Sequence, residues 1–441
     1  MTETIPATPL PRAKRVPRIV IVGGGIAGLS LATKLGTRLG RTKKAEVTLI
    51  DKNAAHVWKP MLHTFAAGTS HVYQEKIPFL AHASQHGFRY VLGALADIDR
   101  NARTVALDPL VSDEGETILH RRLINYDVLI LAAGSRANDF GTPGVAEFCR
   151  FIDDINEAQS FNDRLYDDLL RTAEYGGALR IAIVGGGATG VELAAEISQL
   201  LELIRNYGGD LRPCLELTLI EAGSRILASF PETVATAATR QLRDLGITVL
   251  TDAQVVGADK DGFALADGTR VEAKLRVWAA GIKAPAAFAH LSGFEQTRTG
   301  QIVTNPTFQT TTDEHVFAVG DCASLRLDGA ERPLPPTAQV ARQQAAHLGR
   351  HLPAWIEGTK IPPFVFRDFG SLVSLSKYNA FGTLARRGFF RDGFIEGRFA
   401  QLSHAMLYRM HQAELHGAPR TALLWLSGRI AALVRPSVRI D

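Results

Sequence analysis

Cysteine is scarce in this chain of 441 residues, and neither long apolar runs nor a strong charge imbalance occurs. The three cysteines, Cys149, Cys214 and Cys322, form no C-x-x-C motif, which argues against a zinc ribbon and a dithiol redox centre. No stretch has the roughly 20 uninterrupted apolar residues that a membrane-spanning helix needs. The net charge of +4 does not argue for nucleic-acid binding. We therefore expect neither a metal site nor a nucleic-acid partner.

Glycine, by contrast, is abundant, and a glycine-rich motif occurs twice in the chain. An apolar, β-branched run at 18–22 leads into Gly23-Gly24-Gly25-Ile26-Ala27-Gly28, and a helix-like run follows. A similar run at 180–184 leads into Gly185-Gly186-Gly187-Ala188-Thr189-Gly190. A single G-x-G-x-x-G is weak evidence, but strand, turn and helix together form the context that a dinucleotide-binding site requires. Two copies predict two dinucleotides, most naturally a flavin that stores electrons and a nicotinamide that delivers them.

Each position of these turns has its own task. The first glycine permits the tight turn, the second lets backbone approach a pyrophosphate, and the third lets the helix pack on the strand. The phosphates are then expected on free N–H groups at the start of each helix. The residues concerned are Gly23, Gly25, Ile26, Ala27 and Gly28 in the first copy, and Gly185, Gly187, Ala188, Thr189 and Gly190 in the second.

An acidic residue ends the second strand of each unit. Asp51 follows the apolar run at 46–50, and Glu221 follows the run at 215–220. A carboxylate at this distance from the fingerprint can accept hydrogen bonds from ribose hydroxyls, although an acid at a strand end can also simply be solvated. Because Glu221 would repel a 2′-phosphate, we expect NADH rather than NADPH in the second unit.

Two strands are expected to end in Ala-Ala-Gly. We interpret residues 124–135 as one long apolar strand and residues 276–281 as its counterpart in the second unit. Small residues at a strand end let backbone come close to a ligand. The residues expected to line cofactors in this way are Ala133, Gly134, Ala280 and Gly281.

A third strand and one loop complete the expected crevice. Residues 315–323 are predicted to form a strand that ends at Gly320-Asp321 and enters a helix. Asp321 can hold a sugar-like hydroxyl chain or cap that helix, and one Asp can serve both roles. The loop at 56–63 follows the second strand, where ligands bind in doubly wound sheets. Its Trp58 and His63 could equally be packing residues.

These motifs together are specific enough to indicate a resemblance to a known family. From Arg18 to the C-terminus the chain resembles the two-dinucleotide-binding flavoproteins, and within them the type II, single-chain NADH:quinone oxidoreductases of bacterial respiratory membranes, in their proteobacterial branch. The segments that carry the resemblance are 23–28, Trp58-Lys59-Pro60, 185–192, 278–285, 320–323, 338–344, and 407–412 with 415–417.

The resemblance implies that FAD binds in the first unit and NADH in the second, with the nicotinamide stacked on the flavin ring. Glu192 would lie near the nicotinamide and tune hydride transfer. Without the resemblance, Glu192 could simply compensate the helix dipole, which contributes about 0.3–1 kcal/mol. The residues implied for FAD are Gly23, Gly25, Gly28, Asp51, Lys59, Ala133, Gly134, Asp321 and Ala338, and those for NADH are Gly185, Gly187, Gly190 and Glu221.

The resemblance also implies a quinone site. Gln339 and Gln343 are four residues apart and share one face of a helix, and a glutamine amide can both donate to and accept from a quinone oxygen. Without the family motif this pair would indicate only a polar helix face. Arg342 is expected to point to solvent. Lys377 could neutralise a reduced quinone or the flavin.

The C-terminal region differs in character from the rest. In residues 401–441 apolar side chains recur at helical spacing, with five arginines against Glu414 and Asp441 and with Tyr408 and Trp425 as interfacial aromatics. Such a segment is typical of a helix that lies in the membrane surface, although it could instead pack on the domains or on a dimer partner. The arginines are Arg409, Arg420, Arg429, Arg435 and Arg439.

The resulting prediction is an α/β flavoprotein that oxidises NADH through FAD and reduces a membrane quinone, ubiquinone or menaquinone, without pumping protons. We expect a homodimer bound peripherally to the cytoplasmic face of the inner membrane. One alternative is a sulfide:quinone oxidoreductase, for which Cys149 and Cys322 are the only conceivable pair, and another is a non-enzymatic NAD/FAD-binding redox sensor. The predicted division is a mobile leader at 1–17, an FAD-binding domain at 18–150 and 285–390, an NADH-binding domain at 151–284 and a membrane-anchoring region at 391–441.

Overall fold

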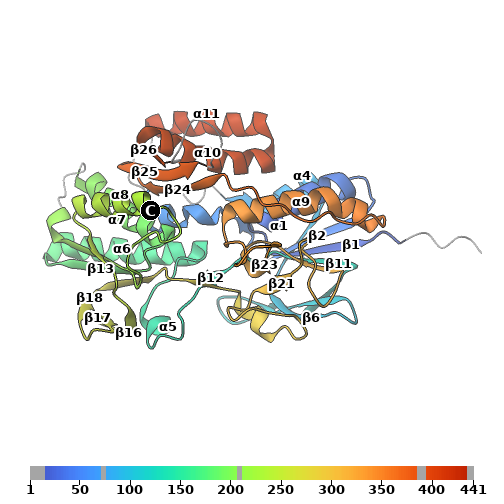
Figure 1. Ribbon diagram of the computed structural model, residues 1–441, viewed down its shortest axis with the longest axis horizontal. Helices are drawn as coiled ribbons and strands as arrows, with labels where there is room; N and C mark the ends of the chain where they lie inside the picture. Colours follow the sequence, from blue (N-terminus) through green and yellow to red (C-terminus); the bar gives the residue numbers. More distant parts are fainter. Residues whose placement is uncertain (1–14, 71–75, 206–210, 385–393, 435–441) are drawn as a thin grey trace, which may run out of the picture.

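Two parallel sheets with helices packed on them form the body of the protein, and a helical layer lies across one side (Figure 1). The computed structural model describes residues 15–70, 76–205, 211–384 and 394–434. The leader expected at 1–17 therefore lies almost wholly outside the described residues. The sheet order confirms the predicted α/β class with two Rossmann-like units.

The first sheet has five strands in the order β22-β11-β1-β2-β5. They are β1 (Arg18–Val22), β2 (Glu46–Asp51), β5 (Arg89–Leu92), β11 (Val128–Leu131) and β22 (Val316–Ala318). Alternate residues of β1 face opposite layers, as the pleat requires. Ile19 and Ile21 pack toward α1 (Ile26–Leu35) and α9 (Ala338–Ile356). Val20 and Val22 pack toward a small antiparallel sheet of β6 (Leu95–Asp99), β7 (Thr104–Leu107) and β10 (Arg122–Asn125).

The second sheet repeats this plan in the order β15-β14-β13-β19. Its strands are β13 (Leu179–Val184), β14 (Leu215–Ile220), β15 (Thr248–Leu250) and β19 (Leu275–Trp278). Ile181 and Ile183 face α6 (Ile155–Tyr175), α7 (Ala188–Arg205) and α8 (Glu232–Asp244). Ala182 and Val184 face the antiparallel sheet of β16 (Val255–Asp259), β17 (Gly262–Leu265) and β18 (Arg270–Glu272). The duplicated sequence phrase thus corresponds to a duplicated structural unit.

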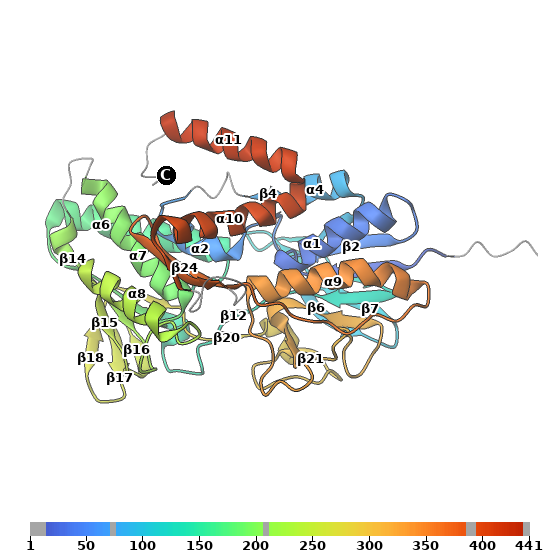
Figure 2. The same cartoon turned by 45° about the horizontal axis from the view of Figure 1, so that its top comes forward.

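Two short strands join the units. β12 (Arg136–Ala137) carries the chain out of the first unit, and β20 (Ile282–Lys283) brings it back; the two pair in antiparallel fashion (Figure 2). After β12, the side chain of Asp154 caps α6 by accepting from the N–H groups of Asn156 and Glu157. The pairing of β12 with β20 and the cap of α6 thus fix the segments that connect the two units.

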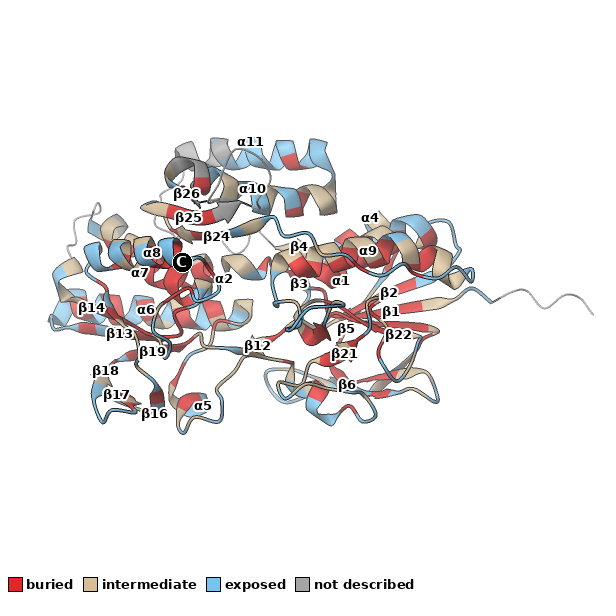
Figure 3. Ribbon diagram, viewed as in Figure 1, coloured by how far each residue is buried: buried red, intermediate tan, exposed pale blue. Residues whose placement is uncertain are grey.

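The C-terminal part forms a third layer that lies over both units (Figures 1 and 2). It consists of an antiparallel sheet, β24 (Gly370–Leu375), β25 (Asn379–Leu384) and β26 (Phe394–Glu396), followed by α10 (Gly397–His416) and α11 (Ala418–Val434). Figure 3 shows α11 as mostly exposed where it is described, in contrast to the buried strands of the two sheets. Among the residues described, no helix combines the length and the apolar character needed to cross a bilayer.

Two expectations about local structure are wrong. Residues 124–135 do not form one strand, because the chain breaks at Tyr126-Asp127 and β10 and β11 belong to different sheets. Asp127 instead binds the Arg18 side chain and backbone N–H at the start of β1. The segment after β22 enters no helix either: a short 3-10 turn at Gly320–Cys322 leads into β23 (Ala323–Leu325). Asp321 therefore caps no helix there.

Candidate cofactor and electron-transfer site

The first glycine of each fingerprint lies against the Ala-Ala-Gly end of a neighbouring strand. A β-carbon on Gly23 would come within 2.4 Å of the Ala132 carbonyl oxygen, and one on Gly185 within 2.7 Å of the backbone of Ala279. Both glycines also have positive φ, 104° and 114°. No other residue fits these turns, because a side chain would clash and the backbone conformation favours glycine. Each unit thus packs its glycine turn against a strand end in the same way.

The middle glycine of each fingerprint faces open space. A β-carbon on Gly25 or Gly187 would meet no atom within 4 Å, and both residues are exposed. They precede α1 and α7, whose first N–H groups have no partner within the helix. Exposed glycine backbone at a helix N-terminus is suited to a pyrophosphate. The residues present therefore fit one dinucleotide in each unit, with Ile26, Ala27, Ala188 and Thr189 as the first helical residues.

The two acids at the strand ends hold the fingerprint turns in the same way. Asp51 accepts from the N–H groups of Gly24 at 2.6 Å and Asn53 at 2.7 Å. Glu221 accepts from the N–H groups of Gly186 at 2.7 Å and Gly223 at 2.7 Å. Burial raises the pKa of Asp51 above its usual range, although these backbone hydrogen bonds oppose that shift. Each acid thus fixes the glycine-rich loop of its unit.

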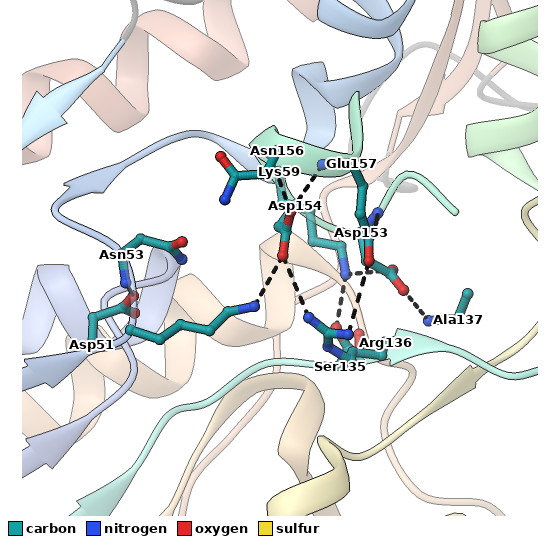
Figure 4. Close-up of polar contacts among 11 residues, drawn as sticks. Asp51, Asn53, Lys59, Ser135, Arg136, Ala137, Asp153, Asp154, Asn156 and Glu157 are labelled. Atoms are coloured by element: carbon teal, nitrogen blue, oxygen red, sulfur yellow. Dashed lines mark hydrogen bonds and ion pairs between the residues drawn. The ribbon is translucent and has the colours of Figure 1, made fainter. Parts of the chain in front are cut away.

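The remaining residues expected around FAD converge near the start of β12. Gly134 has a φ of 71° and open space at its β-carbon, and Ala133 is half-buried beside it. The Ser135 hydroxyl donates to Asp321 at 2.8 Å. Lys59 donates to the Ser135 carbonyl at 2.8 Å (Figure 4). Lys59 and Asp321, far apart in the sequence, thus both form a hydrogen bond with Ser135.

Figure 4 also shows how this corner joins the two units. The Asp153 carboxylate contacts Lys59 at 3.2 Å and accepts from the N–H of Ala137 at 2.6 Å. The adjacent Asp154 pairs with Lys52 and Arg136. Carboxylates at the start of α6 therefore hold both the loop of Lys59 and the crossover strand β12.

Glu192 lies where three segments meet. It is buried on α7, accepts from the N–H of Ser374 in β24 at 3.0 Å, and lies 3.5 Å from Nδ1 of His63 on α2 (Leu62–Ala66). Burial raises the pKa of Glu192 to about 8, with a further contribution from Glu196 one turn along. Glu192 is therefore largely protonated at neutral pH, unlike a carboxylate that only complements a helix dipole.

The glutamine pair contacts the segment before β24. Gln339 accepts from the N–H of Phe369 at 2.7 Å and donates to the carbonyl of Gly370 at 3.1 Å. Gln343 donates to the carbonyl of Arg367 at 2.7 Å and accepts from its N–H at 3.1 Å. Both amides thus bind backbone, and a quinone at this face would compete with the same groups.

Two cations have partners that the sequence did not indicate. Arg342 was expected to point to solvent; its side chain is 39% exposed, but its Nε also lies 3.0 Å from Glu414 on α10. Lys377, in the turn after β24, lies 3.1 Å from Glu202 on α7. The structure therefore places Lys377 beside a carboxylate of the NADH unit.

Several contacts of the site were not expected from the sequence. Gln344, buried on α9, accepts from the N–H of Gly320 at 2.7 Å and so fixes the turn that carries Asp321. Glu196 accepts from Thr69 at 2.5 Å. His56 and His411 meet at 2.9 Å between their Nε2 atoms. Each of these contacts joins segments that are far apart in the sequence, so no local pattern indicated it.

The buried histidines predict acid lability. Burial lowers the pKa of His56 to about 3 and that of His411 to about 4. The unfolded chain takes up protons on them near pH 6.5, so below that pH it binds more protons than the folded protein. The free energy of unfolding should fall by about 2 kcal/mol per histidine between pH 6.5 and pH 5. Denaturant titrations of wild type and His411→Gln check this, because the variant should lose less; equal losses would contradict it.

Comparisons with known proteins agree with this geometry. The sequence matches the Pyridine nucleotide-disulphide oxidoreductase family over residues 17–345. It is 37% identical to a type II NADH:quinone oxidoreductase from Haemophilus influenzae over 96% of this chain and 99% of that protein. The chain belongs to the type II NADH:quinone oxidoreductase family.

More distant matches agree in sequence or in fold. A type II NADH:quinone oxidoreductase from Staphylococcus aureus is 28% identical over 83% of this chain and 89% of its own length. The structure of NDH2 from Plasmodium falciparum in complex with NADH has a TM-score of 0.83 at 19% identity and covers 97% of this chain and 100% of its own. The sulfide:quinone oxidoreductase from Aquifex aeolicus has a TM-score of 0.71 at 17% identity, with 95% of each chain covered. At such identities the two structural matches show the fold alone.

Proposed function

We propose that this protein oxidises NADH and passes two electrons through FAD to a quinone, without pumping protons. The observation that carries this proposal is the 37% identity to a type II NADH:quinone oxidoreductase along nearly the whole of both chains. Two cradles of one design in a single chain support it, because the reaction requires two dinucleotides. FAD, when bound, supplies the two-electron redox chemistry that amino-acid side chains lack.

Each unit of the chain contributes binding groups to one cofactor. Gly25, the start of α1 and Asp51 would bind the pyrophosphate and ribose of FAD, with Ser135 holding Asp321 for the ribityl chain. Gly187, the start of α7 and Glu221 would bind NADH, and Ala280 and Gly281 would line it. Glu192 would hold a proton beside the nicotinamide, because it is buried and largely neutral at pH 7. We also propose the domain division at 18–150 with 285–390, 151–284 and 391–441.

The quinone is proposed to bind near Gln339 and Gln343. Their amides contact backbone groups of residues 367–370, so a quinone oxygen would replace one of these contacts, and the displaced carbonyl, in a largely exposed segment, would bind water instead. Lys377 would supply positive charge from the turn after β24, moderated by Glu202. Either ubiquinone or menaquinone satisfies this chemistry.

A steady-state assay separates this proposal from a sulfide-dependent one. Cys149 and Cys322 are both buried, and burial raises the pKa of each thiol to about 12, so neither is a ready thiolate nucleophile. We expect NADH to drive reduction of a soluble quinone analogue and sulfide to drive none. Turnover with sulfide alone would favour the sulfide:quinone oxidoreductase, and negligible turnover with either donor would favour a redox sensor.

The C-terminal helices are proposed to bind the membrane surface. α10 and α11 expose several large apolar side chains, together with Trp425 and Arg420. Figure 3 shows α11 as a largely exposed helix at the outer edge of the C-terminal layer. Apolar faces with aromatic and basic residues are suited to the lipid interface. The exposed apolar residues are Leu402, Met406, Leu407, Met410, Leu423, Leu424, Leu426 and Ile430. The side chain of Arg429, and residues Arg435 and Arg439, lie outside the description.

Charged substitutions on α11 test this membrane contact. The double variant Leu423→Glu, Leu426→Glu should lose binding to vesicles that contain anionic lipid by at least about 100-fold, because each buried leucine contributes about 1.5–3 kcal/mol. A matched control places glutamates at Ile118 and Leu123, which are equally exposed but lie in the first unit. Flotation measures binding. A control variant that detaches while the α11 variant still floats would contradict the assignment.

The cellular location and the oligomeric state are also proposals. Binding to the cytoplasmic face of the inner membrane and a homodimer are expected from the family resemblance. Sedimentation velocity in detergent tests the second point: a mass of one chain would contradict it.

A further inference from the structure

We propose that His56 and His411 are positioning residues for the FAD cradle, so that the C-terminal helix α10 helps to set the phosphate-binding loop. His56 Nδ1 lies 2.8 Å from the carbonyl oxygen of Gly24, and His56 Nε2 lies 2.9 Å from Nε2 of His411. Both rings are buried, at 3% and 4% exposed. This inference rests on the proposed binding of FAD in the first unit.

The geometry fixes the direction of this hydrogen-bond chain. A carbonyl oxygen only accepts, so the Nδ1 atom of His56 must carry the proton. The Nε2 atom of a neutral His56 is then an acceptor, and Nε2 of His411 must donate to it. Burial favours the neutral form of both rings, in agreement with this arrangement. Protons therefore point from His411 to His56 and from His56 to Gly24.

Fixing the Gly24 carbonyl also fixes the neighbouring N–H. The peptide between Gly24 and Gly25 is planar and trans, so its carbonyl and its N–H point in opposite directions. With the carbonyl turned toward His56, the N–H of Gly25 points away from that side chain. Gly25 is the exposed glycine with open space around it. His56 thereby orients the donor that a pyrophosphate would meet, while Asp51 holds the N–H of Gly24 from the other side.

The position of α10 is itself well determined. Glu414, one turn beyond His411, binds Ser30 at 2.7 Å and Lys34 on α1, and Arg342 at 3.0 Å on α9. Trp58 stacks on His411 with ring centres 6.0 Å apart. The helix that carries His411 is thus anchored to the two helices that cover the FAD unit.

In the NADH unit, the corresponding glycine carbonyl is held by a hydrogen bond from within the unit rather than from the C-terminal region. There the carbonyl of Gly186, the counterpart of Gly24, accepts from the backbone N–H of Leu227 at 2.7 Å. Leu227 belongs to the NADH unit itself. A disturbance of α10 should therefore weaken the binding of FAD and leave the binding of NADH unchanged, and this asymmetry distinguishes positioning from general destabilisation.

The test uses three variants of the full-length protein. His411→Leu removes the donor, His411→Gln retains an N–H donor, and His416→Leu makes the same chemical change on the same helix beside His82. We expect His411→Leu to raise the FAD dissociation constant by about tenfold, as for one lost hydrogen bond, and the other two variants to stay near wild type. The affinity for NADH, measured with FAD at saturating concentration, should be unchanged in all three. Equal FAD retention in His411→Leu and wild type would overturn the proposal, as would a matching loss in His416→Leu.

A second measurement does not depend on activity. Nitrogen chemical shifts of ¹⁵N-histidine-labelled wild type, with the His56 signals assigned by their loss in His56→Asn, report the ring tautomer. We expect the proton of His56 on Nδ1. A proton on Nε2 of His56 would overturn the proposal even if the enzyme binds FAD normally, whereas a protein that binds no flavin would instead refute the proposed function.

Discussion

Valine at the middle glycine of each fingerprint is expected to remove one cofactor and spare the other. Gly25→Val should purify almost free of flavin, and Gly187→Val should retain flavin but show a KM for NADH raised about 100-fold, equivalent to about 2.7 kcal/mol. A β-carbon at either position meets no protein atom within 4 Å, and neither glycine has a positive φ. The apoprotein therefore tolerates the change, and the loss reports the ligand that approaches there.

Flavin absorbance of the purified proteins and NADH kinetics measure these effects. Gly428→Val is a matched control, because Gly428 is also open but lies on α11 away from both fingerprints. Loss of flavin in both fingerprint variants, or in neither, would contradict the assignment of FAD to the first unit and NADH to the second.

Glu192→Gln is expected to lower turnover at least about tenfold and to remove a titration near pH 8. Acid–base groups in a site commonly contribute 10²–10⁴-fold, and Glu192 has a pKa of about 8 because it is buried. Glutamine keeps the shape and can still accept from the N–H of Ser374. The pH profile of turnover should therefore bend near pH 8 in wild type and be flat there in the variant.

The pH dependence of stability tests the protonation of Glu192 independently of turnover. A carboxyl whose pKa is raised on folding binds more protons in the folded state between pH 4.5 and about 8, so the contribution of Glu192 to stability falls as the pH rises through this window. Below pH 6.5 the buried histidines act in the opposite direction, so the fall in wild-type stability should be visible between pH 6.5 and about 8. Glu192→Gln should remove this fall. Glu202→Gln is the control, since Glu202 lies on the same helix but pairs with Lys377 near the surface. A bend near pH 8 that persists in Glu192→Gln would contradict the role of this residue.

The fold was largely predictable because its signals are local. The two glycine turns, their β-branched strands and the acids at 51 and 221 lie close together in the sequence, and each constrains the backbone directly. The expected strand at 124–135 failed for a different reason. Its apolar run continues across Tyr126-Asp127, and only the tertiary pairing of Asp127 with Arg18 reveals the break.

The site was predictable only in part because much of it is built from long-range contacts. Lys59 and Asp321 were expected at the cofactor, but their common partner Ser135 was not. The pairing of Arg342 with Glu414 joins residues 72 positions apart, and that of His56 with His411 joins residues 355 apart. Neither contact has a periodic pattern, so no spacing rule could reveal it.

The most direct test of the account is an anaerobic experiment on the purified protein. NADH added without oxygen should bleach the absorbance of the bound flavin, and a soluble quinone analogue added afterwards should restore it with one quinone reduced per NADH consumed. Purified protein that carries no flavin and takes up none, or a flavin that NADH leaves fully oxidised, would contradict the proposal that electrons pass from NADH through FAD to quinone.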